Sequence, residues 1–299
     1  METTGQFLSP TRQAEILPFE TAPRPVVGFA CDYPSGLSSG FHDHPRAQLL
    51  YAISGVMRVE IQASHYVVPP TTALFLPAGA QHAVSMDGPV AMRELFLRED
   101  AATRVGVAPK VIAVSGLLRE VIVAACAEPV EWEQHGRGHH LAELALDEIA
   151  RSTPLPLGLP LPRDPRLRRV VTLLRDRPHD RRSLEAWAEL ANASSRTLAR
   201  MFRAETGLSF RQWRQQARLT EALSALTMGV QPAKAAAIAG FESIPAFGAA
   251  FRAFFGITPG QARLLHPDAR RRQAAGQEVS QPARGGAAST NHCRYAPRS

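Results

Sequence analysis

The sequence predicts an α+β protein in two folded parts, with β-strands in the first part and helices alone in the second. Between residues 26 and 98, glycine and proline interrupt short apolar runs about every ten residues, a cadence typical of a β-sandwich or small barrel. From about residue 108 the apolar residues recur at helical spacing. The five prolines of residues 152–165 cannot continue a helix, so this segment marks the boundary between the two parts.

The length and composition are those of an ordinary globular protein. A chain of 299 residues has room for two separate cores, and 45% hydrophobic with 20% charged residues is typical of soluble domains. No apolar run approaches the ~20 residues that cross a membrane, and the N-terminus lacks a signal-peptide pattern. Cys31, Cys126 and Cys293 are odd in number and widely scattered, so we expect a cytoplasmic protein without a disulfide framework.

The charge is distributed unevenly along the chain. Residues 1–160 carry 11 lysines and arginines against 17 acidic residues, a net charge of −6. Residues 161–270 carry 18 against 9, a net of +9, and residues 271–299 carry 5 against 1, a net of +4. A basic segment joined to an acidic one indicates a polyanionic partner for the C-terminal half only, the alternative being a solvated basic surface.

The predicted strands are short, and two helices follow them. The runs "LLYAISG", "VMRVEIQ", "HYVVPP" and "ALFLPAG" are each expected to form a separate strand. The stretches "VSGLLREVIVAAC" and "HHLAELALDEIAR" predict an amphipathic helical hairpin whose apolar stripes need a partner surface, either a dimer mate or the β-part. The residues expected in these stripes are Leu117, Val121, Ala124, Leu141, Leu144 and Ile149.

These patterns divide the chain into five segments. We expect a stiff extended linker where the prolines gather and a disordered basic tail where apolar residues are almost absent. The predicted segments are a β-domain at 1–105, a helical and possible dimerisation region at 106–152, the linker at 153–165, an all-helical domain at 166–265 and the tail at 266–299.

The helical domain contains an internal duplication. Leu198, Phe202 and Gly207 align with Phe247, Phe251 and Gly256 at a constant offset of 49 residues. Each copy predicts a helix, a short turn and a second helix that a serine caps and a glycine ends. This is the helix-turn-helix layout, in which the second helix enters the major groove, and two copies can read two adjacent grooves roughly 34 Å apart.

The second copy also carries a specific signature. Its "GF" followed by "FGAAFRAFFGITP" resembles the DNA-binding domain of the AraC/XylS family of transcriptional regulators, as does "RTLARMFRAETGLSF" in the first copy. The resemblance covers about 100 residues and implies a seven-helix domain in which a long central helix joins two recognition helices. It also implies sequence-specific binding to promoter DNA.

The chemistry of the side chains separates the two recognition helices. Arg196 and Arg200 lie four residues apart on one face, and an arginine in the groove can form a bidentate contact with guanine, worth ~1–3 kcal/mol of discrimination. In the second copy Ile244 can at most touch a thymine methyl group, so we expect the first copy to supply most base-specific energy. The candidate DNA contacts are Ser194, Ser195, Arg196, Thr197, Arg200, Arg203, Arg214, Arg218, Ser243 and Ile244.

Four of these candidates, two serines and two arginines, have expected roles other than base contacts. Ser194 and Ser195 are expected to cap the first recognition helix and touch phosphate. Arg214 and Arg218 follow helical spacing between the copies, on a face that either contacts the DNA backbone or is simply solvated.

The β-part contains histidines at ligand spacing. "HDHPRAQLLYAISG" and "PAGAQH" resemble the two cupin motifs, with Gln48 in the acidic position and Met86 where asparagine is common. The resemblance implies a barrel in which His42, His44, Gln48 and His82 converge. Three imidazoles suit zinc, nickel, iron or copper, whereas the neutral Gln48 is a weaker ligand than a carboxylate. The alternative to a divalent metal is a site whose histidines hydrogen-bond an effector or one another.

Together these features predict a regulator and not an enzyme. The leading hypothesis is a homodimeric transcription factor, activator or repressor, controlled by a small molecule in the cupin pocket and free of membrane partners. A metal-dependent cupin enzyme fused to a DNA-binding module is the alternative, although Gln48 replaces the acid and no convincing carboxylate base lies in the motifs. A third hypothesis is an architectural DNA binder, which would have its cavity filled by side chains.

Overall fold

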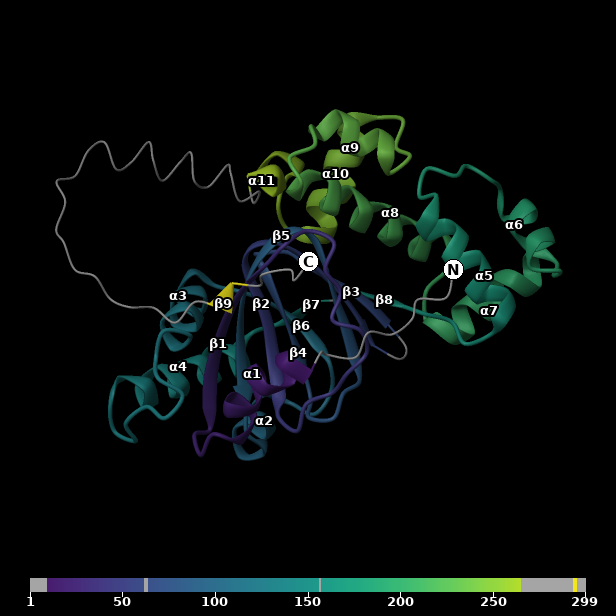
Figure 1. Cartoon of the computed structure of the whole chain (residues 1–299). Helices are drawn as coiled ribbons and strands as arrows, with labels where there is room; N and C mark the ends of the chain where they lie inside the picture. The colour runs from purple at the N-terminus through teal and green to yellow at the C-terminus, as the bar shows by residue number, and fades with distance from the viewer. Residues whose placement is uncertain (1–9, 62–63, 156, 265–292, 295–299) are drawn as a thin grey trace, which may run out of the picture. The chain divides into compact units, whose positions relative to one another are not determined.

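The computed structural model describes residues 10–61, 64–155, 157–264 and 293–294, and the chain folds as two compact units (Figure 1). The first unit contains the described residues up to Leu155, apart from residues 64–65, together with Cys293 and Arg294. The second unit contains residues 157–264 together with residues 64–65.

The first unit is built on one strongly bent antiparallel sheet. Its strands are β1 (Val26–Tyr33), β2 (Ala47–Ile61), β3 (Ser64–Val68), β4 (Thr72–Leu76), β5 (His82–Leu97), β6 (Lys110–Ala113), β7 (Pro154–Leu155) and β9 (Cys293–Arg294). Neighbours follow the order β7-β6-β4-β2-β5-β1-β9, and β3 pairs with β2. The pairings along β7-β6-β4-β2-β5-β1 are antiparallel, and β9 pairs with β1 in parallel.

Two of the predicted strands form a single strand. The run "LLYAISG" and the residues "VMRVEI" of the next run are both within β2, which pairs with β5 from Ala47 to Ile61. The pairing shifts register on both sides of Ser54, so a β-bulge bends the strand where the sequence analysis placed a break. Gly55 sits at this bulge with φ +82°, and a Cβ there would lie 2.3 Å from the carbonyl oxygen of Pro89. Only glycine fits this position without displacing the backbone.

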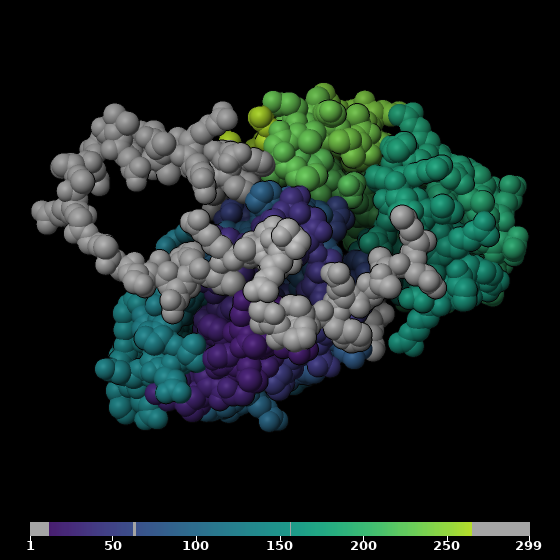
Figure 2. All heavy atoms as spheres, viewed as in Figure 1, coloured from purple at the N-terminus to yellow at the C-terminus, as the bar shows by residue number. Residues whose placement is uncertain are grey.

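The described part of the first unit contains four helices, and the sequence analysis missed the first two of them. They are α1 (Pro10–Thr21), α2 (Glu99–Val105), α3 (Gly116–Ala125) and α4 (Arg137–Arg151). The low amphipathicity of α1 and its internal Pro18 explain why no helical pattern was apparent there. In the space-filling view α1, coloured purple, forms part of the surface of the first unit (Figure 2).

The predicted hairpin exists, but its buried faces are shifted by about one residue. Leu118 and Leu146 are buried, whereas Leu117 and Leu144, which were expected in the stripes, are exposed. The buried residues of α3 and α4 join one core with Leu49, Phe75 and other sheet residues, so the partner surface of the hairpin is the sheet. The predicted helical region, 106–152, also contains the strand β6, which pairs with β4.

The predicted linker is extended, and part of it pairs with a strand of the first unit. Prolines disfavour helix, and residues 154–155 form β7, which pairs with Val111 and Ile112 of β6, while Gly158–Pro160 form the short strand β8. Most of the predicted tail, 266–299, lies outside the described residues. Its described residues, Cys293 and Arg294, form β9.

From Pro165 onward the described part of the second unit is helical. It contains α5 (Pro165–Asp176), α6 (Leu184–Leu190), α7 (Ser195–Thr206), α8 (Phe210–Thr227), α9 (Pro232–Ile238), α10 (Ile244–Phe255) and α11 (Pro259–Arg263). The long α8 contacts both helix-turn-helix copies, α6–α7 and α9–α10, as the resemblance implied. Trp187, Phe202 and Trp213 are fully buried around the first copy, and Phe247 and Phe251 are fully buried in the second.

The caps of the two recognition helices follow the duplicated pattern. The Ser194 hydroxyl accepts a hydrogen bond from the Thr197 amide, and the Ser243 hydroxyl accepts one from the Ala246 amide. Gly207 and Gly256 end the helices in the left-handed conformation, with φ of 71° and 72°. Among the described residues, no helix combines the length and apolar character needed to cross a bilayer.

Gly55→Ala should destabilise the first unit more than Gly36→Ala. Both glycines have positive φ, 82° and 78°, so both substitutions incur the left-handed strain of about 1–2 kcal/mol. Only the Cβ at position 55 meets backbone, because nothing lies within 4 Å of a Cβ at position 36. Urea unfolding curves should therefore show a clearly larger loss of unfolding free energy for Gly55→Ala. Equal losses would contradict the bulge geometry.

Candidate functional site

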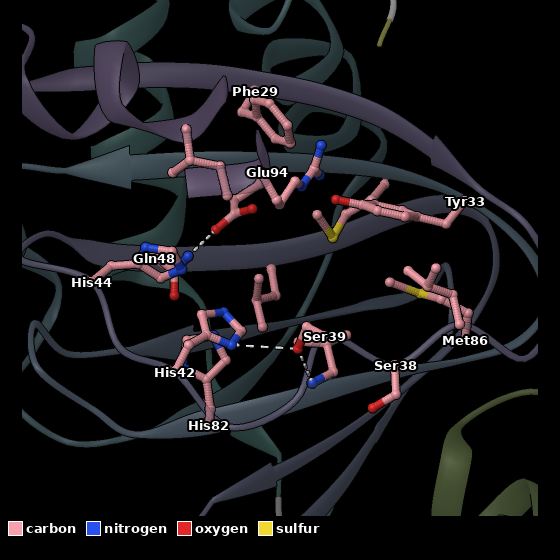
Figure 3. A pocket seen from close by; sticks show the side chains of 16 residues that line it. Phe29, Tyr33, Ser38, Ser39, His42, His44, Gln48, His82, Met86 and Glu94 are labelled. Atoms are coloured by element: carbon pink, nitrogen blue, oxygen red, sulfur yellow. Dashed lines mark hydrogen bonds between the residues drawn. The ribbon is translucent and has the colours of Figure 1, made fainter. Parts of the chain in front are cut away.

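A cavity of about 390 Å³ opens inside the first unit, and its volume is in the range of small-molecule sites (Figure 3). The cavity is not filled by side chains, whereas the hypothesis of an architectural DNA binder expected a filled one. Residues of α1, β1, β2, β5 and the segment 37–44 line it. These residues are Arg12, Ile16, Phe29, Tyr33, Leu37, Ser38, Ser39, His42, His44, Gln48, Leu50, His82, Val84, Met86, Met92 and Glu94.

The three motif histidines come together in this cavity. His42 and His82 exchange both backbone hydrogen bonds, with N–O distances of 2.9 and 2.8 Å, so they form a directly opposed pair with side chains on one face. The ring centroids lie 4.4 Å apart for His42 and His82, 4.8 Å for His42 and His44, and 5.6 Å for His44 and His82. One nitrogen of each ring lies within 4.8 Å of the others, close enough for the three to hold a metal ion.

Each of these rings has a hydrogen-bond acceptor at Nδ1. Nδ1 of His42 lies 2.9 Å from the Gly40 carbonyl oxygen, and Nδ1 of His82 lies 2.8 Å from that of Ala80. Nδ1 of His44 lies 2.5 Å from Glu20 Oε1. A carbonyl oxygen can only accept, so we assign the ring proton of His42 and of His82 to Nδ1 and the free lone pair to Nε2. This arrangement, with an acceptor behind each imidazole, is the usual environment of metal-binding histidines.

Burial keeps two of the rings uncharged. It lowers the pKa of His42 to about 4 and that of His82 to about 3, and the mutual repulsion of the histidines acts in the same direction. His82 is only 1% exposed, and among the described residues its Nε2 is a buried atom with no hydrogen-bond partner. A buried nitrogen of this kind normally has a partner. A neutral lone pair that lacks one fits a metal ion or a ligand donor.

Gln48 lies beside the histidines and is bonded to a carboxyl group. Gln48 Nε2 donates to Glu94 Oε1, and both side chains are 3% exposed. Burial raises the pKa of Glu94 to about 8. The sequence analysis missed Glu94, which stands in the run "MRELFL" outside both cupin motifs, where an acid next to Arg93 gives no sign of a function.

The helix α1 supplies further residues to the cavity that no motif indicated. Arg12 and Ile16 line the cavity, and Glu20 is the carboxylate behind His44. The guanidinium carbon of Arg12 lies 5.0 Å from the ring centroids of both Phe29 and Tyr33. An arginine held between two aromatic rings keeps its charge at the cavity wall.

The cavity gathers its imidazoles at one end, and the rest of its wall carries both apolar and polar side chains. In Figure 3 the three histidines and Gln48 occupy one end, while Tyr33, Ser38 and Met86 lie at the opposite end. Apolar residues of β1, β2 and β5 also line the cavity, and the guanidinium carbon of Arg12 lies 5.0 Å from the ring centroid of Tyr33. The arrangement suits a small molecule that carries a polar group and an apolar body.

The predicted DNA contacts of the first copy lie on the surface of α7. Arg196, Arg200 and Arg203 are exposed, and Leu198 and Phe202 on the opposite face are fully buried. Ser194 caps the helix, as expected, and its hydroxyl also donates to the Thr197 hydroxyl. Ser195 is partly buried at the first turn. The three arginines are thus the cations that this helix presents to solvent.

The recognition helix of the second copy presents an apolar surface. Ile244 is 56% exposed, and Pro245, Ala246 and Ala249 are exposed with it. None of these side chains carries a hydrogen-bond donor. Ser243 caps the helix from an exposed position.

Arg214 and Arg218 have partners within the protein. Arg218 donates from Nε to the Pro178 carbonyl oxygen at 2.7 Å, and both arginines donate to that of Asp180. Arg214 donates also to the Arg182 carbonyl oxygen at 3.0 Å. Their guanidinium groups are half-buried and hold the loop between α5 and α6, and a contact of these arginines with the DNA backbone stays a prediction.

Comparison with known proteins gave matches in both units. A helix-turn-helix domain model matches residues 187–264, and a cupin domain model matches residues 29–97. The chain is 32% identical to the HTH-type transcriptional regulator NimR of Escherichia coli over 230 residues, which cover 76% of this chain and 84% of that protein.

Two further similarities are more distant. The chain is 30% identical to the HTH-type transcriptional regulator RipA of Corynebacterium glutamicum over 217 residues, or 71% of this chain and 60% of that protein. Among solved structures, ToxT from Vibrio cholerae aligns with 82% of this chain and 100% of its own, at 9% identity and a TM-score of 0.36.

The first unit of the metal-free protein should lose stability as the pH falls below 6.5. An unfolded chain binds protons at His42 and His82 near pH 6.5, whereas the folded chain does so only near pH 4 and pH 3. Between these limits each histidine removes about 1.4 kcal/mol of stability per pH unit.

Urea unfolding in a chelator at pH 4.5–7 measures this slope. His82→Gln should flatten the slope, and the exposed-site control His140→Gln should not. A slope that His82→Gln leaves unchanged would contradict this assignment.

Proposed function

The chain belongs to the AraC/XylS family of transcriptional regulators with an N-terminal cupin domain, and we propose that a small molecule in its cupin pocket controls how it binds promoter DNA. The cavity of about 390 Å³, with three imidazoles gathered at one end and apolar side chains along its wall, is the observation that carries this proposal. A ligand exerts such control only if it binds the DNA-competent and DNA-incompetent states with different affinities.

The first helix-turn-helix copy reads the bases in this proposal. The exposed Arg196 and Arg200 of α7 enter one major groove, with Arg203 and Thr197 nearby and with Ser194 and Ser195 at the phosphates. The apolar surface of α10, with Ile244 and the capping Ser243, positions the second copy in the adjacent groove.

The pocket also holds a divalent transition metal, zinc, nickel, iron or copper, in this proposal. His42, His44 and His82 bind it through Nε2, and Gln48 is the fourth ligand. The orphaned Nε2 of His82 and the three acceptors behind Nδ1 support this assignment. When bound, the ion supplies a positive centre for a polar group of the effector.

We further propose that the regulator acts in the cytoplasm as a homodimer. The exposed Leu117 of α3 and Leu144 of α4 leave apolar surface on the hairpin that a second copy could cover. Sedimentation velocity of the full chain tests this point, and Leu117→Lys should shift a dimer toward the monomer.

Arg200→Ala should cost far more specific DNA affinity than Ile244→Ala. A lost bidentate guanine contact costs ~1–3 kcal/mol, about 5- to 150-fold in affinity, whereas a lost methyl contact costs little. Gel-shift titrations against the operator and a scrambled fragment of equal length measure both effects. Equal losses from the two substitutions would contradict the proposed division between the copies.

The proposed control by an effector is testable through the histidines. Small molecules that raise the melting temperature of the purified chain are collected first, and their effect on operator affinity is then measured. His42→Ala should abolish the effect of such a molecule on operator affinity while leaving the effector-free affinity within about two-fold. If no stabilising molecule alters operator affinity in the parent protein, pocket control is wrong.

A further inference from the structure

Gln48 differs from a carboxylate ligand in one physical respect, the inequivalence of its two terminal atoms. A carboxylate presents two similar oxygens, so either can face a metal ion. A side-chain amide presents one carbonyl oxygen with lone pairs and one NH₂ group that only donates hydrogen bonds. An amide therefore serves as a metal ligand only if something holds it with the oxygen toward the ion.

Glu94 is placed to hold Gln48 in this way. Gln48 of β2 is paired with Phe96 of β5, and Leu50 is paired with Glu94, so Gln48 and Glu94 are diagonal neighbours on one face of the sheet. Gln48 Nε2 donates to Glu94 Oε1. Because the amide is planar, this bond turns Oε1 of Gln48 away from Glu94 and toward the histidine end of the cavity (Figure 3).

Glu94 acts on the amide from outside the ligand set. The atoms within 4.8 Å of one another that could hold a metal ion come from His42, His44 and His82, and no Glu94 oxygen joins them among the described residues. Glu20 occupies a comparable place behind His44. The cavity thus places one carboxyl group behind a histidine and another behind the amide.

We propose that Glu94 is a positioning residue that orients the Gln48 amide so that its carbonyl oxygen completes a metal site of four neutral donors with His42, His44 and His82. This inference rests on the metal site of the proposed function. In this chain the neutral Gln48 stands in the acidic position of the first cupin motif. The carboxyl group of Glu94, on the neighbouring strand β5, lies behind the amide.

The first test measures Co²⁺ binding by the full chain, with visible absorption reporting the ligand set and calorimetry the affinity. Glu94→Leu removes the acceptor, so Co²⁺ affinity should fall about 10- to 100-fold, the usual effect of losing a partner behind a ligand. Glu94→Gln keeps a carbonyl acceptor for Gln48 Nε2 and should stay within a few-fold of the parent. Far-UV circular dichroism without metal checks folding, and Glu94→Met is the second apolar variant if Glu94→Leu does not fold.

The second test restores the ligand without restoring Glu94. Gln48→Glu supplies a carboxylate that needs no orientation, so the double variant Gln48→Glu with Glu94→Leu should bind Co²⁺ within a few-fold of Gln48→Glu alone. The same Glu94→Leu change in the parent background should keep its 10- to 100-fold effect. A general loss of packing would instead lower affinity equally in both backgrounds.

The outcomes separate this inference from the proposed function. The role of Glu94 is wrong if folded Glu94→Leu or Glu94→Met keeps the Co²⁺ affinity and spectrum of the parent. It is also wrong if Glu94→Leu lowers the affinity equally in the parent and Gln48→Glu backgrounds. Neither result would contradict the metal site. If the parent binds no Co²⁺ more tightly than His42→Ala, the metal site itself is wrong, and the role of Glu94 is lost with it.

Discussion

The backbones of His42 and His82 exchange both of their hydrogen bonds, and the polar end of the cavity depends on this pairing. The segment 36–42 lies along the first half of β5, with Gly36, Ser39 and His42 all bonded to it. Pairing by backbone bonds places two imidazoles on one face without any contribution from the side chains. The side chains are then free to point their Nε2 atoms into the cavity, because Nδ1 of each is bonded to a nearby oxygen.

Burial gives this cluster its chemical character. Imidazoles in water are partly protonated near neutral pH, but removal from water disfavours the charged ring, and the pKa values of His42 and His82 fall to about 4 and 3. The same burial raises the pKa of Glu94 to about 8. Desolvation thus produces neutral imidazole nitrogens and a carboxyl group that favours its neutral form. The guanidinium group of Arg12, which also lines the cavity, lies near the rings of Phe29 and Tyr33. A site of this kind suits recognition of a small molecule.

The two helix-turn-helix copies show how one backbone pattern can carry two surfaces. Both recognition helices begin at a serine cap and end at a left-handed glycine, and both bury a pair of large apolar side chains. Their exposed N-terminal turns differ, with Arg196 and Arg200 on α7 and with Ile244, Pro245 and Ala246 on α10, while Arg203 and Arg252 are exposed at equivalent positions in the last turns. Packing constrains only the buried face, so the exposed face is available for a different role in each copy.

The sequence by itself determined the two folded parts, the duplicated helix pairs with their caps and the three histidines, because hydrophobic period, cap residues and ligand spacing are local properties. Tertiary structure alone decided that α1 brings Arg12 and Glu20 to the cavity, since these residues are far in sequence from the motifs and follow no pattern. It also decided the register of α3 and α4, where Leu118 and not Leu117 is buried, because a helical stripe predicts a face only to within about one residue.

Arg214 and Arg218 follow the spacing of a solvated or DNA-facing helix, yet they bond the carbonyl oxygens of a loop more than 30 residues away. Such contacts depend on how distant segments pack, and no local pattern contains that information.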